Sequence, residues 1–297
     1  MASDPSRSRR VPRVTRELVR LVRPGQWVKN LLVVAAPLAA GTLLQPAVAG
    51  RVAVAFVAFV LASGATYALN DLLDADADAA HPVKRARPVA SGRVPRRTAA
   101  VVVAVLAVAA LAVAASVGLL LVVGGYLALT AAYSAGLKHE PVVELAIVAL
   151  GFVLRAIAGG VATDTPLSQW FLIVTGFGSL LVVTGKRESE LVLAQRDGRT
   201  PRRATARYTT AFLRVVAATA AAMTVAGYAL WAADVAPQAR EPWIAVSVVP
   251  FTVAVLRFLL DAEDAQAEEP ERTVVADRVL LVLVLLWLVT YAVGALL

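Results

Sequence analysis

The chain alternates between long apolar runs and short polar segments, and this pattern predicts its fold. A helix of about 20 apolar residues is long enough to cross the hydrocarbon core of a bilayer. Runs of that length recur from residue 31 to the end of the chain. The pattern predicts an all-α integral membrane bundle of nine transmembrane helices, at residues 31–48, 52–70, 98–117, 119–137, 141–162, 168–185, 208–233, 243–260 and 279–297.

The segment before the first span, residues 1–29, is a basic arm with one amphipathic stretch. Val14, Leu18, Leu21 and Val22 share one helical face, and the arginines between them fall elsewhere. This spacing predicts an interfacial helix on the membrane, with a disordered basic arm as the alternative. The segment has no apolar core followed by a cleavage site, so we do not expect a signal peptide.

The positive charges test this topology. Of the 29 Lys and Arg residues, all but three fall on one side of the nine predicted spans. Arg51 and Arg240 lie on the other side, and Arg155 lies within a span that is otherwise read as free of charge. By the positive-inside rule, the N-terminus and the charged loops face the cytoplasm and the C-terminus lies outside. We therefore expect a multi-pass protein of the plasma membrane.

Composition narrows the classes of function. Apolar residues make up 59% of the chain, more than in a typical soluble domain. The net charge of +8 lies in loops between spans, which indicates membrane topology and argues against a nucleic-acid partner. There is no cysteine, so neither a disulfide framework nor a thiolate metal site is expected. The chain has 25 Arg but only four Lys, and only two Asn, so these scarce types are informative.

An acidic segment ends the second predicted span. Asn70, Asp74 and Asp78 are four residues apart and stack on one face of a helix, and Asp71 and Asp76 lie among them. Carboxylates at this spacing repel one another, so a positive group should lie between them. Hard oxygen ligands suit Mg²⁺, which usually joins carboxylates to substrate phosphates. The alternative is a solvated acidic loop after a helix.

A basic segment follows directly, with Lys84, Arg85 and Arg87 in the sequence from His81 to Pro88. Carboxylates that hold a metal, next to cations that hold phosphate oxygens, make a site for a magnesium-bridged polyphosphate. The alternative is that these charges only follow the positive-inside rule.

Further polar residues stand where apolar spans meet the cytoplasm, or within a span. An intramembrane arginine such as Arg155 needs a polar cavity or a partner, and a structural ion pair is its alternative role. For Tyr133 and Lys138, at the end of the predicted span 119–137, the alternative is an ordinary interfacial turn. The candidates are Gln26, Lys29 and Asn30 at the start of span one, Tyr133 and Lys138 at the end of span four, and Lys186, Arg187 and Glu190 at the end of span six.

These motifs resemble the UbiA superfamily of membrane prenyltransferases. The matching residues are Asn70-Asp71-x-x-Asp74-x-x-x-Asp78, then Arg87-Pro88 and Ser91-Gly92, and later Tyr133-Ser134 with Leu137-Lys138. The resemblance covers nearly the whole chain as one domain, 1–297. It implies nine transmembrane helices around a central cavity open to the cytoplasm, with two aspartate-rich motifs that hold Mg²⁺ and a diphosphate.

One departure narrows the resemblance. The second aspartate motif of the superfamily is replaced by residues 185–190, Gly-Lys-Arg-Glu-Ser-Glu. With this mixed motif, the chain resembles one branch of the superfamily. Members of that branch transfer 5-phosphoribose from phosphoribosyl pyrophosphate (PRPP) to decaprenyl phosphate, for the arabinose-containing polymers of the cell wall. Residues 23–30, 81–88, 154–163 and 184–187 carry that similarity. PRPP, a polyprenyl phosphate and membrane lipid are therefore the expected partners, and a homo-oligomer is left open.

The resemblance implies a role for each matching position. Asn70, Asp71, Asp74 and Asp78 would bind Mg²⁺, and Asp74, Asp78 and Lys186 would be catalytic. The other positions would bind substrate: Gln26, Lys29, Asn30, Lys84, Arg85, Arg87, Tyr133, Lys138, Arg155, Arg187 and Glu190. A polyprenyltransferase for an aromatic quinone precursor is the alternative enzyme, and a membrane transporter is the alternative from another class.

Overall fold

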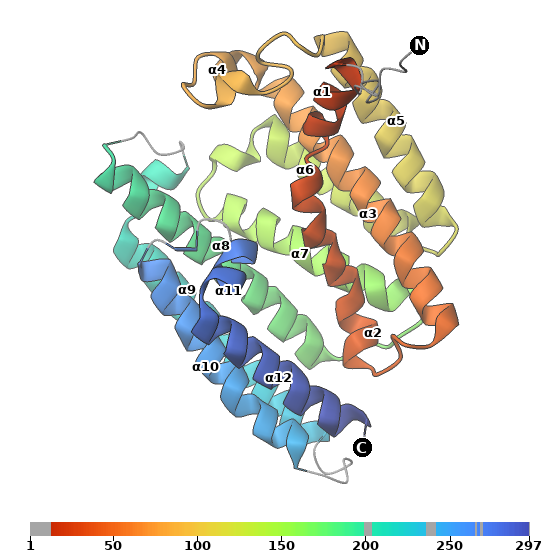
Figure 1. The fold of residues 1–297 in the computed structure, drawn as a ribbon, viewed down its shortest axis with the longest axis vertical. Coiled ribbons are helices and arrows are strands. Elements are labelled where there is room, and N and C mark those ends of the chain that lie inside the picture. The colour runs from red at the N-terminus through yellow and green to blue at the C-terminus, as the bar shows by residue number, and fades with distance from the viewer. Residues whose placement is uncertain (1–12, 199–203, 236–241, 265, 268–269, 297) are drawn as a thin grey trace, which may run out of the picture. The chain divides into compact units, whose positions relative to one another are not determined.

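The computed structural model describes residues 13–198, 204–235, 242–264, 266–267 and 270–296, and its regular elements are all helices (Figure 1). The α-helices are α1 (Arg13–Leu21), α2 (Ala35–Ala39), α3 (Pro46–Leu73), α4 (Ala75–Ala79), α5 (Arg96–Ala115), α6 (Leu120–Ala135), α7 (Val143–Ala162), α8 (Gln169–Arg196), α9 (Thr210–Val235), α10 (Trp243–Glu263), α11 (Pro270–Ala276) and α12 (Arg278–Leu296). Short 3-10 helices are η1 (Pro24–Val34), η2 (Lys84–Ala86), η3 (Leu137–His139) and η4 (Thr205–Arg207). The all-α prediction is confirmed for these ranges, and residues 1–12 of the predicted basic arm lie outside them.

Six of the described helices are long and apolar enough to cross a membrane, namely α3, α5, α7, α8, α9 and α10. Two more, α6 and α12, are apolar but shorter. The multi-pass prediction is therefore confirmed at this coarser level.

The predicted span at 31–48 is not one α-helix, so the predicted bounds of this element were wrong. This segment contains the end of η1, the five-residue α2, a turn and the start of α3. Gly41 takes a left-handed φ of +67° in the turn, a conformation that glycine adopts without steric cost. Pro46 then opens α3, where its missing N–H is not needed. Hydropathy did not reveal the break, because the residues on both sides of it are apolar.

The chain divides into two compact units, each described here by itself. The first comprises residues 1–31 and 51–135, with α1, most of α3, α4, α5 and α6. Within it, Phe59 of α3 packs edge-on against Tyr126 of α6, with ring centroids 5.3 Å apart. The hydroxyls of Thr66 and Thr130, on the same two helices, lie 3.0 Å apart. Aromatic and hydroxyl contacts thus join α3 to α6.

A helix is confirmed where the amphipathic stretch was predicted, as α1, and protein covers part of its apolar face; its place at the membrane surface stays a prediction. Leu21 is fully buried in a cluster with Ala68 and Ala75, and Leu18 packs against the same cluster. The side chain of Val22, just after α1, approaches α3 so closely that a Cβ on Gly64 would lie 3.5 Å from it.

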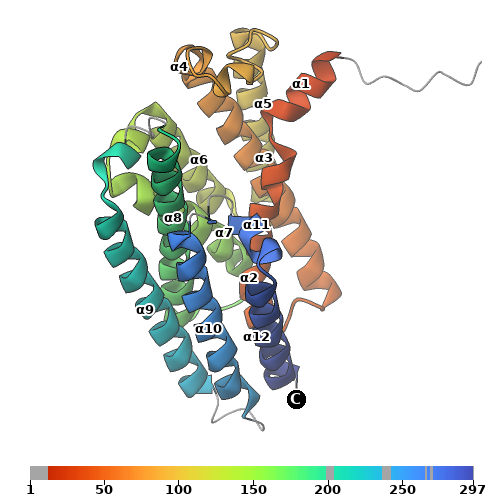
Figure 2. The same ribbon diagram turned by 60° about the vertical axis from the view of Figure 1, so that its left-hand side comes forward.

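The second unit comprises residues 32–50 and 136–297. In it α8 packs against α7 and α9, and α10 packs against α9 and α12 (Figure 2). Small residues permit close contact, since a Cβ on Gly159 of α7 would lie only 2.0 Å from the carbonyl oxygen of Val33. Ser168 caps α8 by accepting a hydrogen bond from the backbone N–H of Phe171 at 3.0 Å.

The helix that carries the mixed motif is longer than predicted. Residues 186–190 were expected in a loop after residue 185, but α8 continues to Arg196. Arg187 and Glu188 are buried on this extension, and each has a carboxylate or guanidinium partner. Because these charges are paired, α8 continues past the end of its apolar run.

Candidate active site

The acidic segment begins at the end of α3 and continues through Asp74 into α4. The backbone stays in helical register, because the N–H of Asp74 donates to the oxygen of Asn70 at 2.9 Å and the N–H of Asp78 donates to that of Asp74 at 2.8 Å. The predicted spacing of these three residues on successive turns is confirmed.

Two arginines supply the positive charge expected among these carboxylates. Asp71 and Asp78 are buried. Nη1 of Arg87 lies 2.6 Å from Oδ2 of Asp78 and 3.3 Å from Oδ1 of Asp71. Nη2 of Arg23 also contacts Oδ1 of Asp71. Asp74 and Asn70 are partly exposed. Arg87 thus lies between two carboxylates.

Arg23 was not among the predicted site residues. Its backbone has φ +50°, which is uncommon for a residue with a side chain, and Pro24 follows it. Its guanidinium also lies over the ring of Tyr67, 5.1 Å from the centroid. A left-handed arginine of this kind has no signature in the sequence.

The acidic segment suits a hard cation whose shell is completed by other ligands. Among the described residues, no three His, Cys, Asp or Glu side chains assemble into a closed cage. Mg²⁺ rarely uses such cages, since it keeps waters and takes one or two carboxylates together with substrate phosphates. The segment offers oxygen ligands within about two turns of helix. They are the carboxylates of Asp71, Asp74 and Asp78 and the amide oxygen of Asn70. The donor set therefore fits magnesium bound partly by a substrate.

The basic segment divides into an inward and an outward part. Arg87 turns toward the carboxylates, whereas Arg85 is exposed and Lys84 is partly exposed. Nδ1 of His81 accepts hydrogen bonds from the backbone N–H groups of Val83 and Lys84, at 3.2 and 3.3 Å. This acceptor role makes His81 a structural residue of the turn.

The predicted residues before the first span lie on η1. Gln26 and Lys29 are partly exposed. Asn30 is completely buried, and its Nδ2 donates to Oγ of Ser63 on α3 at 3.2 Å. This hydrogen bond joins η1 to α3 within the first unit, and the substrate-binding role of Asn30 stays a prediction.

The remaining candidates lie on three different elements. Tyr133 is partly exposed on α6 in the first unit, and Lys138 is partly exposed on η3 in the second. Arg155 is buried in α7, where its Nη1 donates to the carbonyl oxygen of Gly151 at 2.7 Å. Its guanidinium also lies 5.7 Å from the ring centroid of Phe152. Two contacts of Arg155 are thus with its own helix.

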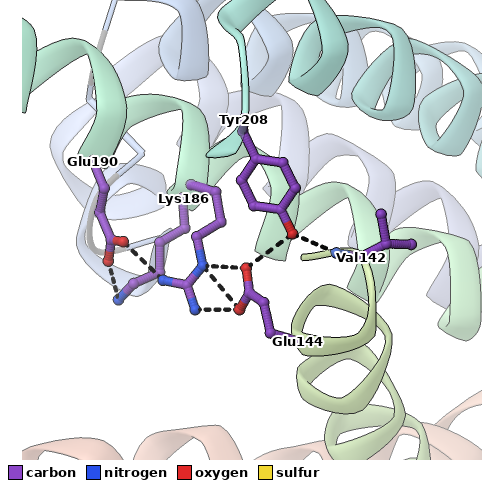
Figure 3. A network of polar contacts seen from close by, with 6 residues as sticks. Val142, Glu144, Lys186, Glu190 and Tyr208 are labelled. Atoms are coloured by element: carbon purple, nitrogen blue, oxygen red, sulfur yellow. Dashed lines mark hydrogen bonds and ion pairs between the residues drawn. The ribbon is translucent and has the colours of Figure 1, made fainter. Parts of the chain in front are cut away.

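The mixed motif of the second unit forms a polar network with a residue of α7 (Figure 3). Nε and Nη2 of Arg187 donate to the carboxylate of Glu144, at 2.9 Å to Oε1 and 2.7 Å to Oε2. Nη1 of Arg187 donates to Oε2 of Glu190 at 2.8 Å. Nζ of Lys186 lies 4.0 Å from Oε1 of the same carboxylate. Lys186 is the most exposed of the four, with 30% of its side chain accessible.

Glu144 was not among the predicted site residues, although the sequence contains a signal for it. It lies inside the span predicted for residues 141–162, which had been read as free of charge apart from Arg155. A carboxylate within an apolar span needs a partner, by the same reasoning that was applied to Arg155.

A tyrosine completes the network. The hydroxyl of Tyr208 accepts the backbone N–H of Val142 at 2.7 Å and lies 3.5 Å from Oε1 of Glu144. Val142 has φ +66°, a strained value for a β-branched residue, at the start of α7. Burial raises the pKa of the Tyr208 hydroxyl above its ordinary value, so it stays protonated and can donate to Glu144.

A second buried glutamate of α8 belongs to a different ion pair. Oε1 of Glu188 accepts from Nε of Arg214 on α9 at 2.8 Å, and Nη2 of Arg214 lies 2.9 Å from Glu263. Adjacent residues of the motif therefore face different partners, Arg187 toward α7 and Glu188 toward α9.

Farther along α8, an apolar pocket of about 330 Å³ opens in the second unit. Its aromatic lining includes Trp170, Phe171, Trp231, Phe251 and Trp287. The hydroxyls of the two tyrosines that also line it have partners within the protein: Tyr228 pairs with Ser247 at 2.7 Å, and Tyr291 donates to the oxygen of Ala39 at 2.8 Å. The pocket thus suits an apolar ligand.

Comparison with known proteins gives both a family and close relatives. The UbiA prenyltransferase family matches residues 31–276. A decaprenyl-phosphate phosphoribosyltransferase of Mycolicibacterium smegmatis is 46% identical over 92% of this chain and 90% of its own length. Proteins of the same name are 47% identical in Mycobacterium tuberculosis, over 92% of both chains, and 43% identical in Corynebacterium glutamicum, over 91% of this chain and 84% of the relative.

Solved structures share the fold. A UbiA homolog from Archaeoglobus fulgidus bound to DMAPP and Mg²⁺ has a TM-score of 0.70 at 18% identity, covering 93% of this chain and 99% of that one. A UbiA homolog from Aeropyrum pernix K1 has a TM-score of 0.60 at 18% identity, covering 94% and 99%.

Proposed function

The chain belongs to the UbiA prenyltransferase family, and we propose that it transfers the 5-phosphoribosyl group of PRPP to decaprenyl phosphate. The products are decaprenylphosphoryl-5-phosphoribose and pyrophosphate, and the former serves the synthesis of arabinogalactan and lipoarabinomannan. The observation that carries this assignment is the identity of 43–47% to decaprenyl-phosphate phosphoribosyltransferases over almost the whole chain. The mixed motif of α8 supports it, because a substrate with an additional phosphate needs additional cations.

We assign the pyrophosphate of PRPP to the acidic segment. Asn70, Asp71, Asp74 and Asp78 would hold Mg²⁺, which when bound supplies positive charge to the leaving group. Arg87 and the more exposed Lys84 and Arg85 would contact the same phosphates. Asp74 and Asp78 are therefore the acidic residues on which turnover should depend most.

We assign a second phosphate to Lys186. It is the more exposed of the two cations in its network, whereas the guanidinium of Arg187 is engaged by Glu144 and Glu190. The 5-phosphate of PRPP and the lipid phosphate are the two groups it could bind. Gln26, Lys29, Tyr133, Lys138 and Arg155 are proposed to bind the substrates or to line their path.

In the proposed reaction, an oxygen of the lipid phosphate forms a bond to C1 of the ribose as the bond from C1 to the pyrophosphate oxygen breaks. The transition state resembles an oxocarbenium ion, and negative charge grows on the departing pyrophosphate. Cations placed around that group stabilise this charge. A phosphate monoester is already largely ionised at neutral pH, so the nucleophile needs no strong general base. This agrees with the structural role of His81.

The polyprenyl tail is proposed to enter the aromatic pocket of the second unit. The pocket has an apolar lining, and Thr175 on its wall precedes Lys186 on α8 by eleven residues, or about 16 Å along the helix. A phosphate near Lys186 and a tail in the pocket would thus follow one helix.

The proposed setting is the plasma membrane. The six long helices, the shorter α6 and α12 and the segment from η1 to α2 would make nine crossings. The N-terminus and the active site would face the cytoplasm and the C-terminus would lie outside, as the distribution of positive charge predicts.

Product identification tests the assignment. Membranes that contain the protein are incubated with labelled PRPP, Mg²⁺ and polyprenyl phosphates of several lengths, and the lipid extract is analysed. We expect labelled phosphoribose on the lipid. Transfer of a prenyl group to an aromatic acid would indicate the alternative enzyme, and movement of a solute with no new lipid would indicate a transporter.

A further inference from the structure

Lys186 is the last of a row of alternately charged side chains that begins on another helix. Glu144 of α7 binds Arg187, Arg187 binds Glu190, and Glu190 lies next to Lys186 (Figure 3). Glu190 therefore divides its carboxylate between two cations. One oxygen accepts from Arg187 at 2.8 Å, and the other lies 4.0 Å from Lys186.

Because Glu144 and Arg187 are buried, the pairing of charges among these four residues depends on Glu144. Glu144 is 1% exposed and Arg187 is 5% exposed, so neither charge can be neutralised by solvent. With Glu144 ionised, Nε and Nη2 of Arg187 donate to Glu144, and Nη1 donates to Glu190. Without that charge, the guanidinium would draw the Glu190 carboxylate to itself and weaken the contact of Glu190 with Lys186.

Glu144 is itself held in place from two directions. It lies in the first turn of α7, two residues after the strained residue Val142. Tyr208, from the segment after η4, fixes that turn by accepting the N–H of Val142 and reaches the Glu144 carboxylate with the same hydroxyl. Arg187 of α8 and Tyr208 of the segment after η4 thus both contact one buried carboxylate of α7.

We propose that Glu144 is a positioning residue for phosphate binding, acting through Arg187 and Glu190 to hold the ammonium of Lys186 where a substrate phosphate meets it. The inference rests on the proposed function, in which Lys186 binds a phosphate. Glu144 itself touches no substrate.

The test is a mutant cycle in the full-length protein reconstituted in lipid nanodiscs. The variants are Glu144→Gln, Lys186→Met and the double variant. KM and kcat are measured for PRPP and for decaprenyl phosphate. We expect Glu144→Gln to raise, by about tenfold, the KM of the same substrate that Lys186→Met affects. The double variant should be no worse than Lys186→Met alone, and Glu144→Asp should recover part of the loss.

The matched control is Glu188→Gln. Glu188 is equally buried on α8 but pairs with Arg214, so it should leave both KM values unchanged. A purely structural role of Glu144 would lower the amount of active protein and kcat without changing KM. That result, or multiplying effects of Glu144→Gln and Lys186→Met, would overturn the proposal.

Binding measurements separate this inference from the proposed function. PRPP and geranyl phosphate are each titrated calorimetrically against the same variants, without turnover. If the wild type transfers no phosphoribose, the proposed function fails, yet the positioning role still requires that Glu144→Gln and Lys186→Met weaken the same probe to a similar degree. If Lys186→Met weakens neither probe, the positioning role is wrong.

Discussion

Arg87 and Asp78 form an ion pair in which Nη1 lies 2.6 Å from Oδ2, and the same nitrogen lies 3.3 Å from Asp71. One guanidinium thus bridges two buried carboxylates that are two helical turns apart. A metal ion bound to these carboxylates would neutralise part of the negative charge that Arg87 neutralises. This overlap leads to a prediction about Mg²⁺ that does not depend on catalysis.

Arg87→Gln should destabilise the protein by about 2 kcal/mol without Mg²⁺, because Asp71 and Asp78 would repel each other with less compensation. Mg²⁺ should stabilise the variant more than it stabilises the wild type, since the ion replaces the missing positive charge. The thermal unfolding midpoint in detergent, with and without Mg²⁺, measures both effects.

Arg93→Gln is the control for this experiment. Arg93 lies in the same segment but pairs with Glu17 at 3.4 Å, away from the acidic segment. Its response to Mg²⁺ should match that of the wild type. Equal Mg²⁺ shifts for Arg87→Gln and the wild type would argue against a metal among these carboxylates.

Asp74→Asn should lower the rate of phosphoribosyl transfer by at least about 100-fold, because a neutral amide is a weaker magnesium ligand. Asp76→Asn is a matched comparison two residues away. Asp76 is 89% exposed and pairs with the surface residue Arg96, so its loss should change the rate by less than about twofold. Initial rates at saturating PRPP and Mg²⁺ measure the difference. Similar losses in both variants would mean that general negative charge, rather than metal binding at Asp74, is what matters.

Asn30→Ala distinguishes packing from substrate binding. Asn30 was expected to bind substrate, yet it is fully buried and donates to Ser63. The variant should lower the free energy of unfolding by about 1–2 kcal/mol, because a buried hydrogen bond is lost. KM for PRPP and for decaprenyl phosphate should stay the same. A raised KM with unchanged stability would restore the binding role.

Thr175→Phe tests the aromatic pocket as the site of the polyprenyl tail. The larger side chain would fill part of a cavity of about 330 Å³. Overpacking of a bound ligand should raise KM for decaprenyl phosphate about tenfold. Geranyl phosphate, whose tail is too short to reach the pocket, should be unaffected. Leu172→Phe, on the same helix but exposed and outside the pocket lining, is the control. An equal effect on both lipids would place the tail elsewhere.

Features with local causes could be predicted from the chain alone. Apolar runs predicted the helices α3, α5 to α10 and α12, because crossing a bilayer depends on the length and hydropathy of one segment. The four-residue spacing of Asn70, Asp74 and Asp78 predicted their register, which depends only on helical periodicity. The break between α2 and α3 was missed, since Gly41 and Pro46 interrupt a run that stays apolar.

The pairing of charges was decided by the tertiary structure. Arg23 meets Asp71 across 48 residues of chain, and Arg187 meets Glu144 across 43. Composition showed that cations and carboxylates were present, and the positive-inside rule placed most of them on one side. Which cation faces a carboxylate and which stays exposed depends on how separate helices pack, and no local spacing encodes that choice. For this reason Lys186 and Arg187, neighbours in sequence, have different surroundings in the folded protein.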